Sequence, residues 1–173
     1  AQEVAAGLDQ NMAILKALFT DVDILRIKFV GNNHHPALRF AIAFCDGVVA
    51  APVINDNIIR PLMLSDALTP GPGLMDALVT HVIQIAEARQ TAEFWEIIEA
   101  VSYGDTVLFV DGAPKAVLLN TKCFTIRTVA EPDSEKILSG PREGFTESLL
   151  DNLSLIRRRV RTHELKMKVL TLG

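Results

Sequence analysis

The sequence has few cysteines, no long apolar run and no recognisable leader. Its two cysteines, Cys45 and Cys123, lie in separate apolar stretches, so they predict no disulfide framework and two buried thiols. The apolar runs at 41–45 and 48–54 stop well short of the ~20 residues that a membrane-spanning helix needs. The N-terminus lacks the basic-then-apolar layout of a secretion signal. Because the chain opens at Ala1 without a methionine, we expect a piece excised from a longer protein.

Motifs for catalysis, metal binding or nucleotide binding are equally scarce. No serine sits in a nucleophile elbow. The proline-glycine loop at 69–73 lacks the lysine and hydroxyl residue of a phosphate cradle, and its prolines remove N–H donors. His34 and His35 share a turn without a third ligand at matching spacing, so we interpret them as exposed turn residues. We therefore expect no catalysis and no bound cofactor or metal.

Charge is modest overall and unevenly distributed. An apolar fraction of 49% with 22% charged residues is typical of a globular domain and excludes extensive disorder. A net charge of −4 gives no reason to expect nucleic acid as a partner. Residues 146–173 nevertheless carry six lysines and arginines against three acidic residues. A basic C-terminal piece on an acidic body predicts docking of that piece on an acidic surface, its own or a partner's.

Hydrophobic periodicity predicts an α/β (α+β) fold with a mixed, largely antiparallel sheet of about five to six strands flanked by helices. The strand at 24–30 alternates apolar Leu25, Ile27 and Phe29 with basic residues, and Asp111-Gly112 is typical of a hairpin turn. Pro61 predicts a break near the end of its helix. The segment 74–85 fits a helix or a helix running into a strand. The other expected elements are helices over 5–19, 48–64 and 91–103, and strands over 38–45, 107–110, 115–120, 124–129 and 166–172.

A turn followed by a helix dominates the C-terminal part of the sequence. Gly140-Pro141 predicts a rigid turn, and Gly144 permits a second change of direction. Thr146 is placed to cap a helix over 146–161. The apolar stripe of this helix predicts packing on the sheet, and consists of Phe145, Leu149, Leu153, Ile156 and Val160.

Three consecutive arginines, Arg157, Arg158 and Arg159, end this helix. They point to different sides, so they cannot all serve one anion. One interpretation is a solvated helix end that complements the macrodipole. We favour intramolecular or interdomain pairing, with Arg142 and Glu143 as candidate partners, and contact with acidic lipid is an alternative.

The stretch GPREGFTESLLDNLSLIRRRVR, residues 140–161, resembles the signature of the A subunits of spore-germination receptors, the GerA family. The resemblance extends forward into the closing segment 165–173. It extends backward through 127–145, the hairpin around Asp111-Gly112 and FCDGVVAAPVINDNIIRPLM at 44–63. It therefore covers the chain from about Leu38 to its end.

The resemblance implies an α/β subdomain over 1–130, a connector over 131–145, and a helix and strand over 146–173 that lead to a second subdomain. Family members continue into a membrane domain in the inner membrane of spores, and this portion is expected on the cytoplasmic or core side. Expected partners are the receptor B and C subunits and the remaining domains of the same chain. An exposed sheet edge also makes a homo-oligomer possible.

The function implied is non-enzymatic: receptor assembly and signal coupling in nutrient-triggered germination. A ligand-binding module for a small nutrient or ion between subdomains is the alternative. An enzyme and a related sporulation protein are the other hypotheses. The residues expected to form an interaction site or hinge are Pro141, Arg142, Glu143, Gly144, Phe145, Asn152, Arg157, Arg158 and Arg159.

Overall fold

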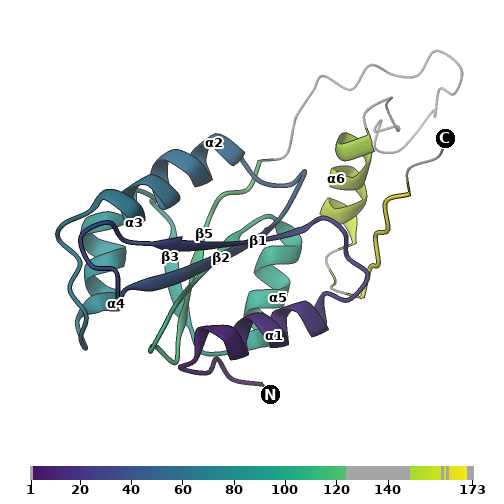
Figure 1. Cartoon of the computed structure of the whole chain (residues 1–173). Helices are drawn as coiled ribbons and strands as arrows, with labels where there is room; N and C mark the ends of the chain where they lie inside the picture. The colour runs from purple at the N-terminus through teal and green to yellow at the C-terminus, as the bar shows by residue number, and fades with distance from the viewer. Residues whose placement is uncertain (1, 124–148, 161, 163, 171–173) are drawn as a thin grey trace, which may run out of the picture.

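The computed structural model describes residues 2–123, 149–160, 162 and 164–170, and its centre is one five-stranded sheet (Figure 1). The strand order is β1-β2-β4-β5-β3, and every neighbouring pair is antiparallel. The predicted fold class is confirmed. The strands are Leu25–Gly31 (β1), Arg39–Cys45 (β2), Ala88–Thr91 (β3), Thr106–Val110 (β4) and Ala116–Leu119 (β5).

Helices cover both faces of the sheet, which gives three layers. One face carries α1 (Leu8–Leu18) and α5 (Phe94–Tyr103). The other carries α2 (Ala51–Ile54), the π turn η1 (Asn55–Ile59) and α3 (Arg60–Leu64), together with α4 (Leu74–Ala77) and the π turn η2 (Leu78–Val82). A further helix, α6 (Leu149–Arg159), lies beside this assembly next to α5.

Each face of the sheet has its own apolar cluster. Leu15 of α1, Ile97 of α5 and Phe109 of β4 belong to the first cluster and are fully buried. Phe40 of β2 and Ile58 of η1 belong to the second. Strands β4 and β5 are buried along their whole length, because helices cover both of their faces. This explains why they read as continuous apolar runs instead of alternating ones.

The two predicted hairpins are present. In β1–β2 the register pairs Leu25 with Cys45 and Gly31 with Arg39. In β4–β5 the turn falls at Asp111-Gly112, where Gly112 has a φ of 89° that glycine adopts readily. The Asp111 carboxylate also accepts the N–H of Leu8 at 3.0 Å, so this turn helps to position the start of α1.

The helical segment after β2 passes through Pro61 without a break, contrary to the sequence prediction. Because proline has no N–H, the carbonyl of Asn57 one turn earlier loses its usual partner. Just before the proline, the π turn pairs the N–H of Arg60 with the carbonyl of Asn55, five residues earlier. The freed Asn57 oxygen accepts the N–H of Gln84 at 3.1 Å. The proline therefore coincides with a link between this helix and the segment after η2.

The segment from 74 to 103 departs from prediction at its middle. The helix formed by α4 and η2 ends at Val82. The edge strand β3 follows, and the sequence predicted no strand there. Thr91 is the last residue of β3, so the prediction that α5 begins there is wrong. Its hydroxyl accepts the N–H of Glu93 at 3.1 Å, just before α5 begins at Phe94. The Thr91 hydroxyl thus stabilises the turn between β3 and α5 and does not cap the helix.

Gly104 ends α5 where two distant segments cross. Its φ is 113°, and a Cβ there would lie 2.6 Å from the carbonyl oxygen of Val48. The backbone of Val48 also accepts the N–H of Cys123 at 2.9 Å. The predicted burial of Cys45 is confirmed, but Cys123 is exposed, because it lies at the outer end of this crossing. The predicted strand over 124–129 lies outside the described residues.

Candidate interaction site

Helix α6 and residues 162 and 164–170 form a compact group, which we call the C-terminal unit; residues 2–123 are the body. Leu153 and Ile156 of α6 and Leu165 beyond it are half-buried and pack against the cluster on the α1/α5 face. The helix contacts α5 and lies beyond one end of the sheet (Figure 1). The prediction that it packs across the sheet face is therefore wrong, because α1 and α5 already occupy that face.

The apolar stripe of α6 is only partly used. Leu149 at its start is 56% exposed and Val160 just after its end is 42% exposed. Leu149, Leu153 and Ile156 line a groove of about 430 Å³ whose other wall is residues 165–170. Val169 and Leu170 on that wall are also exposed. Most of the predicted stripe thus faces a groove, and only its middle contacts the body.

Arg157 is the most deeply buried residue of the unit, with no exposed surface. Its Nη1 donates to the carbonyl of Thr162 at 2.9 Å and its Nη2 to the carbonyl of Leu165 at 3.2 Å. Among the described residues, its Nε has no hydrogen-bond partner. The interpretation of a solvated helix end is wrong for this arginine. The side chain therefore links α6 to the chain that follows it.

The charge of Arg157 is stabilised mainly by dipoles. Among the described residues no carboxylate forms an ion pair with it, so the two carbonyls and the C-terminal end of α6 are the groups that oppose its charge. Burial lowers the pKa of Arg157, and the neighbouring Cys45 acts in the opposite direction. Burial raises the pKa of the Cys45 thiol to about 11, against the effect of the arginine charge. Arg157 of the unit thus lies near Cys45 of the body, whose thiol stays neutral around neutral pH.

The second attachment of the unit is made by main-chain hydrogen bonds at Met167. Its N–H donates to the carbonyl of Asp21 at 3.1 Å, and its carbonyl accepts the N–H of Asp23 at 2.9 Å. Its side chain is 6% exposed and enters the α1/α5 cluster. This is an isolated parallel bridge to Val22, whereas the sequence predicted a closing strand over 166–172. Among the described residues, the main-chain pairing with Val22 does not continue past Met167, because the N–H of Val169 bonds to the Asp23 carboxylate at 2.8 Å instead of to a main-chain carbonyl.

The nine sequence-predicted site residues fall into three groups. Pro141, Arg142, Glu143, Gly144 and Phe145 lie outside the described residues. Within α6, Asn152 is half-buried, Arg157 is buried and Arg159 is exposed, while Arg158 belongs to the helix and its side chain is not described. Asn152, Arg157 and Arg159 differ in exposure, and the predicted interaction site stays a prediction. Across the described ranges, three or more metal-ligating side chains nowhere come together.

Sequence reasoning missed the anchors on the body. Asp21 and Asp23 accept or donate through main-chain groups, and the Asp23 carboxylate also holds the backbone of Val169. Main-chain partners leave no residue-type signature. Asp21 has a φ of 59°, which marks a special turn. That signal is visible only in the structure, because φ cannot be read from residue types alone.

The model of the Bacillus/Clostridium GerA spore germination protein family matches residues 13–173. Spore germination protein B1 of Bacillus subtilis (strain 168) is 37% identical over 173 residues, which cover 99% of this chain and 35% of that protein. The uncharacterized membrane protein YfkQ of the same strain is 33% identical over 164 residues, covering 95% of this chain and 31% of that protein. The chain thus spans about a third of the length of these relatives.

A solved structure has the same fold. The N-terminal domain of the A subunit of the Bacillus megaterium spore germinant receptor GerK3 superposes with a TM-score of 0.73. The match covers 94% of this chain and 58% of that chain, at 18% sequence identity. None of the helices in the part of this chain that the structure describes is both long and apolar enough to cross a bilayer.

Proposed function

This chain belongs to the GerA family of spore germination proteins, and from that premise we propose that it is the N-terminal portion of a germinant-receptor A subunit. Its role is assembly of the receptor and coupling of its signal, without bond chemistry. The likeness of its fold to the N-terminal domain of a receptor A subunit supports this proposal. So do the relatives named for spore germination, within which this chain occupies about a third of the length.

The way the C-terminal unit is attached carries the proposal. Arg157 makes α6 and the chain after it one piece, and Met167 contributes the unit's single buried hydrophobic side chain among the described residues. A piece held by directional hydrogen bonds and little apolar area can change its position without unfolding the body. Movement of α6 is then passed to the segment at 164–170, and from there to whatever follows it.

The proposed organisation has an α/β subdomain over 1–130, a connector over 131–145, and a helix and strand over 146–173, followed by a second subdomain and a membrane domain. Pro141, Arg142, Glu143, Gly144 and Phe145 are proposed as the upstream half of the same joint. The proposed partners are receptor B and C subunits, and the proposed location is the cytoplasmic or core side of the spore inner membrane. The relative YfkQ, which is described as a membrane protein, supports a membrane setting.

A ligand-binding role for the domain is the second candidate. It is favoured by the groove of about 430 Å³ between α6 and residues 165–170, which lies where the chain leads on toward a second subdomain. Titration of the two-subdomain protein with amino acids, sugars and nucleosides distinguishes the candidates. A saturable rise in Tm supports ligand binding, and an unchanged Tm favours a mechanical role.

The coupling role is tested in spores with the full-length protein that contains these residues. Arg157→Met removes the link between α6 and the following chain and keeps an unbranched apolar stem, and Lys16→Met, at an exposed basic residue in the last turn of α1, is the control. We expect Arg157→Met to lower receptor level or nutrient-triggered germination while Lys16→Met leaves both near normal. Unchanged level and germination in Arg157→Met, Arg142→Ala and Phe145→Ala alike would contradict the proposal.

A further inference from the structure

Strand β1 is an edge strand whose outer side carries unused main-chain groups. The N–H of Asp46 donates to the carbonyl of Ile24 at 2.8 Å, so these two residues form a hydrogen-bonded pair. Because such pairs alternate along an antiparallel ladder, every second residue of β1 after Ile24 also bonds to β2. The N–H and C=O groups of Ile27 and Phe29 therefore point away from β2. Among the described residues, no strand pairs with this side of β1.

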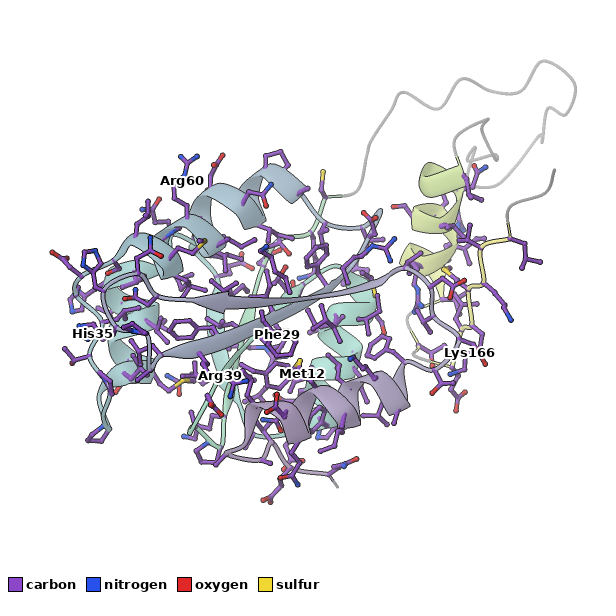
Figure 2. All side chains as sticks on the ribbon, viewed as in Figure 1. Met12, Phe29, His35, Arg39, Arg60 and Lys166 are labelled. Atoms are coloured by element: carbon purple, nitrogen blue, oxygen red, sulfur yellow. The ribbon has the colours of Figure 1, made fainter. Side chains whose placement is uncertain are left out.

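Apolar side chains lie beside these free main-chain groups. Phe29 is 52% exposed, although the sequence predicted an inward-facing residue, because its partner across β2 is the small Ala41 and it lies outside the α1/α5 cluster. Ile27 on the same side is half-buried. Figure 2 shows Phe29 on β1 with Met12 of α1 in the same region of the view. An exposed edge with an apolar side chain is a site where another strand can add.

The face of β1 opposite Ile27 and Phe29 carries the charge that selects the partner. Lys28 is exposed and forms no ion pair with any described residue, whereas Arg26 lies 3.5 Å from the Asp46 carboxylate. The side chains of Lys28 and Arg26 alternate with Ile27 and Phe29, so an added strand meets basic residues on one face and apolar residues on the other. Charge complementarity then requires acidic side chains opposite Lys28.

In two of the registers open to a second copy of this chain, the same lysine disfavours it as the occupant; in the register centred on Phe29, Lys28 instead lies opposite Val30. Antiparallel pairing of β1 with itself about Ile27 places Lys28 opposite Arg26, and pairing that joins Ile27 to Phe29 places Lys28 opposite Lys28. Like charges directly opposite each other destabilise a sheet. A lysine in the middle of an edge strand is a common device against self-association.

We propose that the outer edge of β1 is an interaction surface for an extended segment of another protein, in which apolar residues alternate with aspartate or glutamate. The segment adds to the sheet through the free groups of Ile27 and Phe29. Its apolar side chains cover Phe29, and its carboxylates pair with Lys28. This surface is separate from the C-terminal unit, so it does not depend on the proposed coupling role.

The test measures binding of two labelled, end-blocked peptides to the 173-residue chain, one of alternating valine and glutamate and one of alternating valine and lysine. We expect the glutamate peptide to bind about tenfold more tightly, with amide shifts at Ile27 and Phe29 by NMR. Lys28→Glu should reverse the preference. Equal binding of both peptides, or no binding of either, would overturn the proposal.

Ile27→Pro provides an independent variant. It removes an N–H that points to the free edge and breaks no bond to β2. We expect a folded protein that no longer binds the glutamate peptide; retained binding would overturn the proposal. Sedimentation of the unmodified chain is the third arm. A dimer that Ile27→Pro abolishes would assign the edge to a second copy instead and would also overturn it.

Discussion

The body and the C-terminal unit are held in place by different forces. The body has two apolar clusters, one on each face of the sheet, with many side chains that have no exposed surface. Among its described residues, the unit contributes one buried hydrophobic residue, Met167, three half-buried ones that pack against the α1/α5 cluster, and a buried arginine. Its hydrogen bonds to the body include the two main-chain bonds at Met167 and the bond from the Val169 N–H to the Asp23 carboxylate. Moving an element of the body would break its apolar packing, whereas moving the C-terminal unit would break only a few hydrogen bonds and contacts.

This difference predicts separate behaviour on unfolding. Burial of apolar area is cooperative, because each side chain in a packed cluster contacts several others. A piece attached by a few hydrogen bonds opens locally at lower free energy than the whole domain. The body should therefore unfold as one, and the unit should detach first. The expectations below test that difference, from the largest effect to the smallest.

Truncation of matched leucines tests the contrast most directly. Leu15 in α1 is fully buried, whereas Leu153 in α6 is half-buried. We expect Leu15→Ala to lower the free energy of unfolding by about 2–5 kcal/mol, because it leaves a cavity in the α1/α5 cluster. Leu153→Ala should cost about 1 kcal/mol. Urea unfolding followed by circular dichroism measures both, and equal losses would contradict the comparison.

A glycine pair tests the crossing that closes the body. Gly104→Ala forces a side chain into a positive φ and places its Cβ 2.6 Å from the Val48 oxygen, so we expect a loss of about 3 kcal/mol. Gly112→Ala also has a positive φ but meets nothing within 4 Å, and should cost about 1 kcal/mol. Thermal unfolding of the two variants provides the measurement. A larger effect at Gly112 would show that the close approach at Gly104 is unimportant.

The pH dependence of stability tests the burial of the Cys45 thiol in the body. Burial raises the pKa of the Cys45 thiol to about 11, so the unfolded thiol ionises first and stability falls as pH rises from about 9 to 11. The loss should reach about 2–3 kcal/mol. Cys45→Ala should lack this component, and Cys123→Ala should keep it because that thiol is exposed. Identical pH profiles for the two variants would be inconsistent with a buried, neutral Cys45.

Replacement of Arg157 should have the smallest effect on global stability. Arg157→Met loses two hydrogen bonds and also removes a buried charge, so the free energy of unfolding should change by about 1 kcal/mol or less. Hydrogen exchange at the amides of Met167 and Asp23 should accelerate about tenfold as the unit loosens. Lys16→Met, at an exposed residue in the last turn of α1, is the control. Unchanged exchange at both amides would mean that Arg157 does not hold the unit.

Much of the body followed from local patterns. The β1–β2 and β4–β5 hairpins were predicted because alternation and the Asp111-Gly112 turn are local signals. The edge strand β3 was missed because four residues are too few for periodicity to separate them from a neighbouring helix. The break at Pro61 was wrongly predicted because Gln84, far along the chain, takes up the carbonyl that the proline leaves free.

The helix at 149–159 shows the limit of such patterns at the candidate site. Its existence and its apolar stripe were predicted, and α6 is present. Its buried side was not, because burial depends on which neighbouring surface is vacant. With the sheet face occupied by α1 and α5, the helix lies beside α5, and Arg157 is enclosed where residues 162–165 turn back.

The sequence by itself determined the fold class, both hairpins, the end of α5 at Gly104 and membership in the GerA family, because each depends on residue types close together in the chain. Only the tertiary structure decided that Arg157 is buried, that Cys123 is exposed and that β1 has an outer edge with Phe29 uncovered. Those outcomes depend on which distant segments come together, and solvent exposure is a property of that packing.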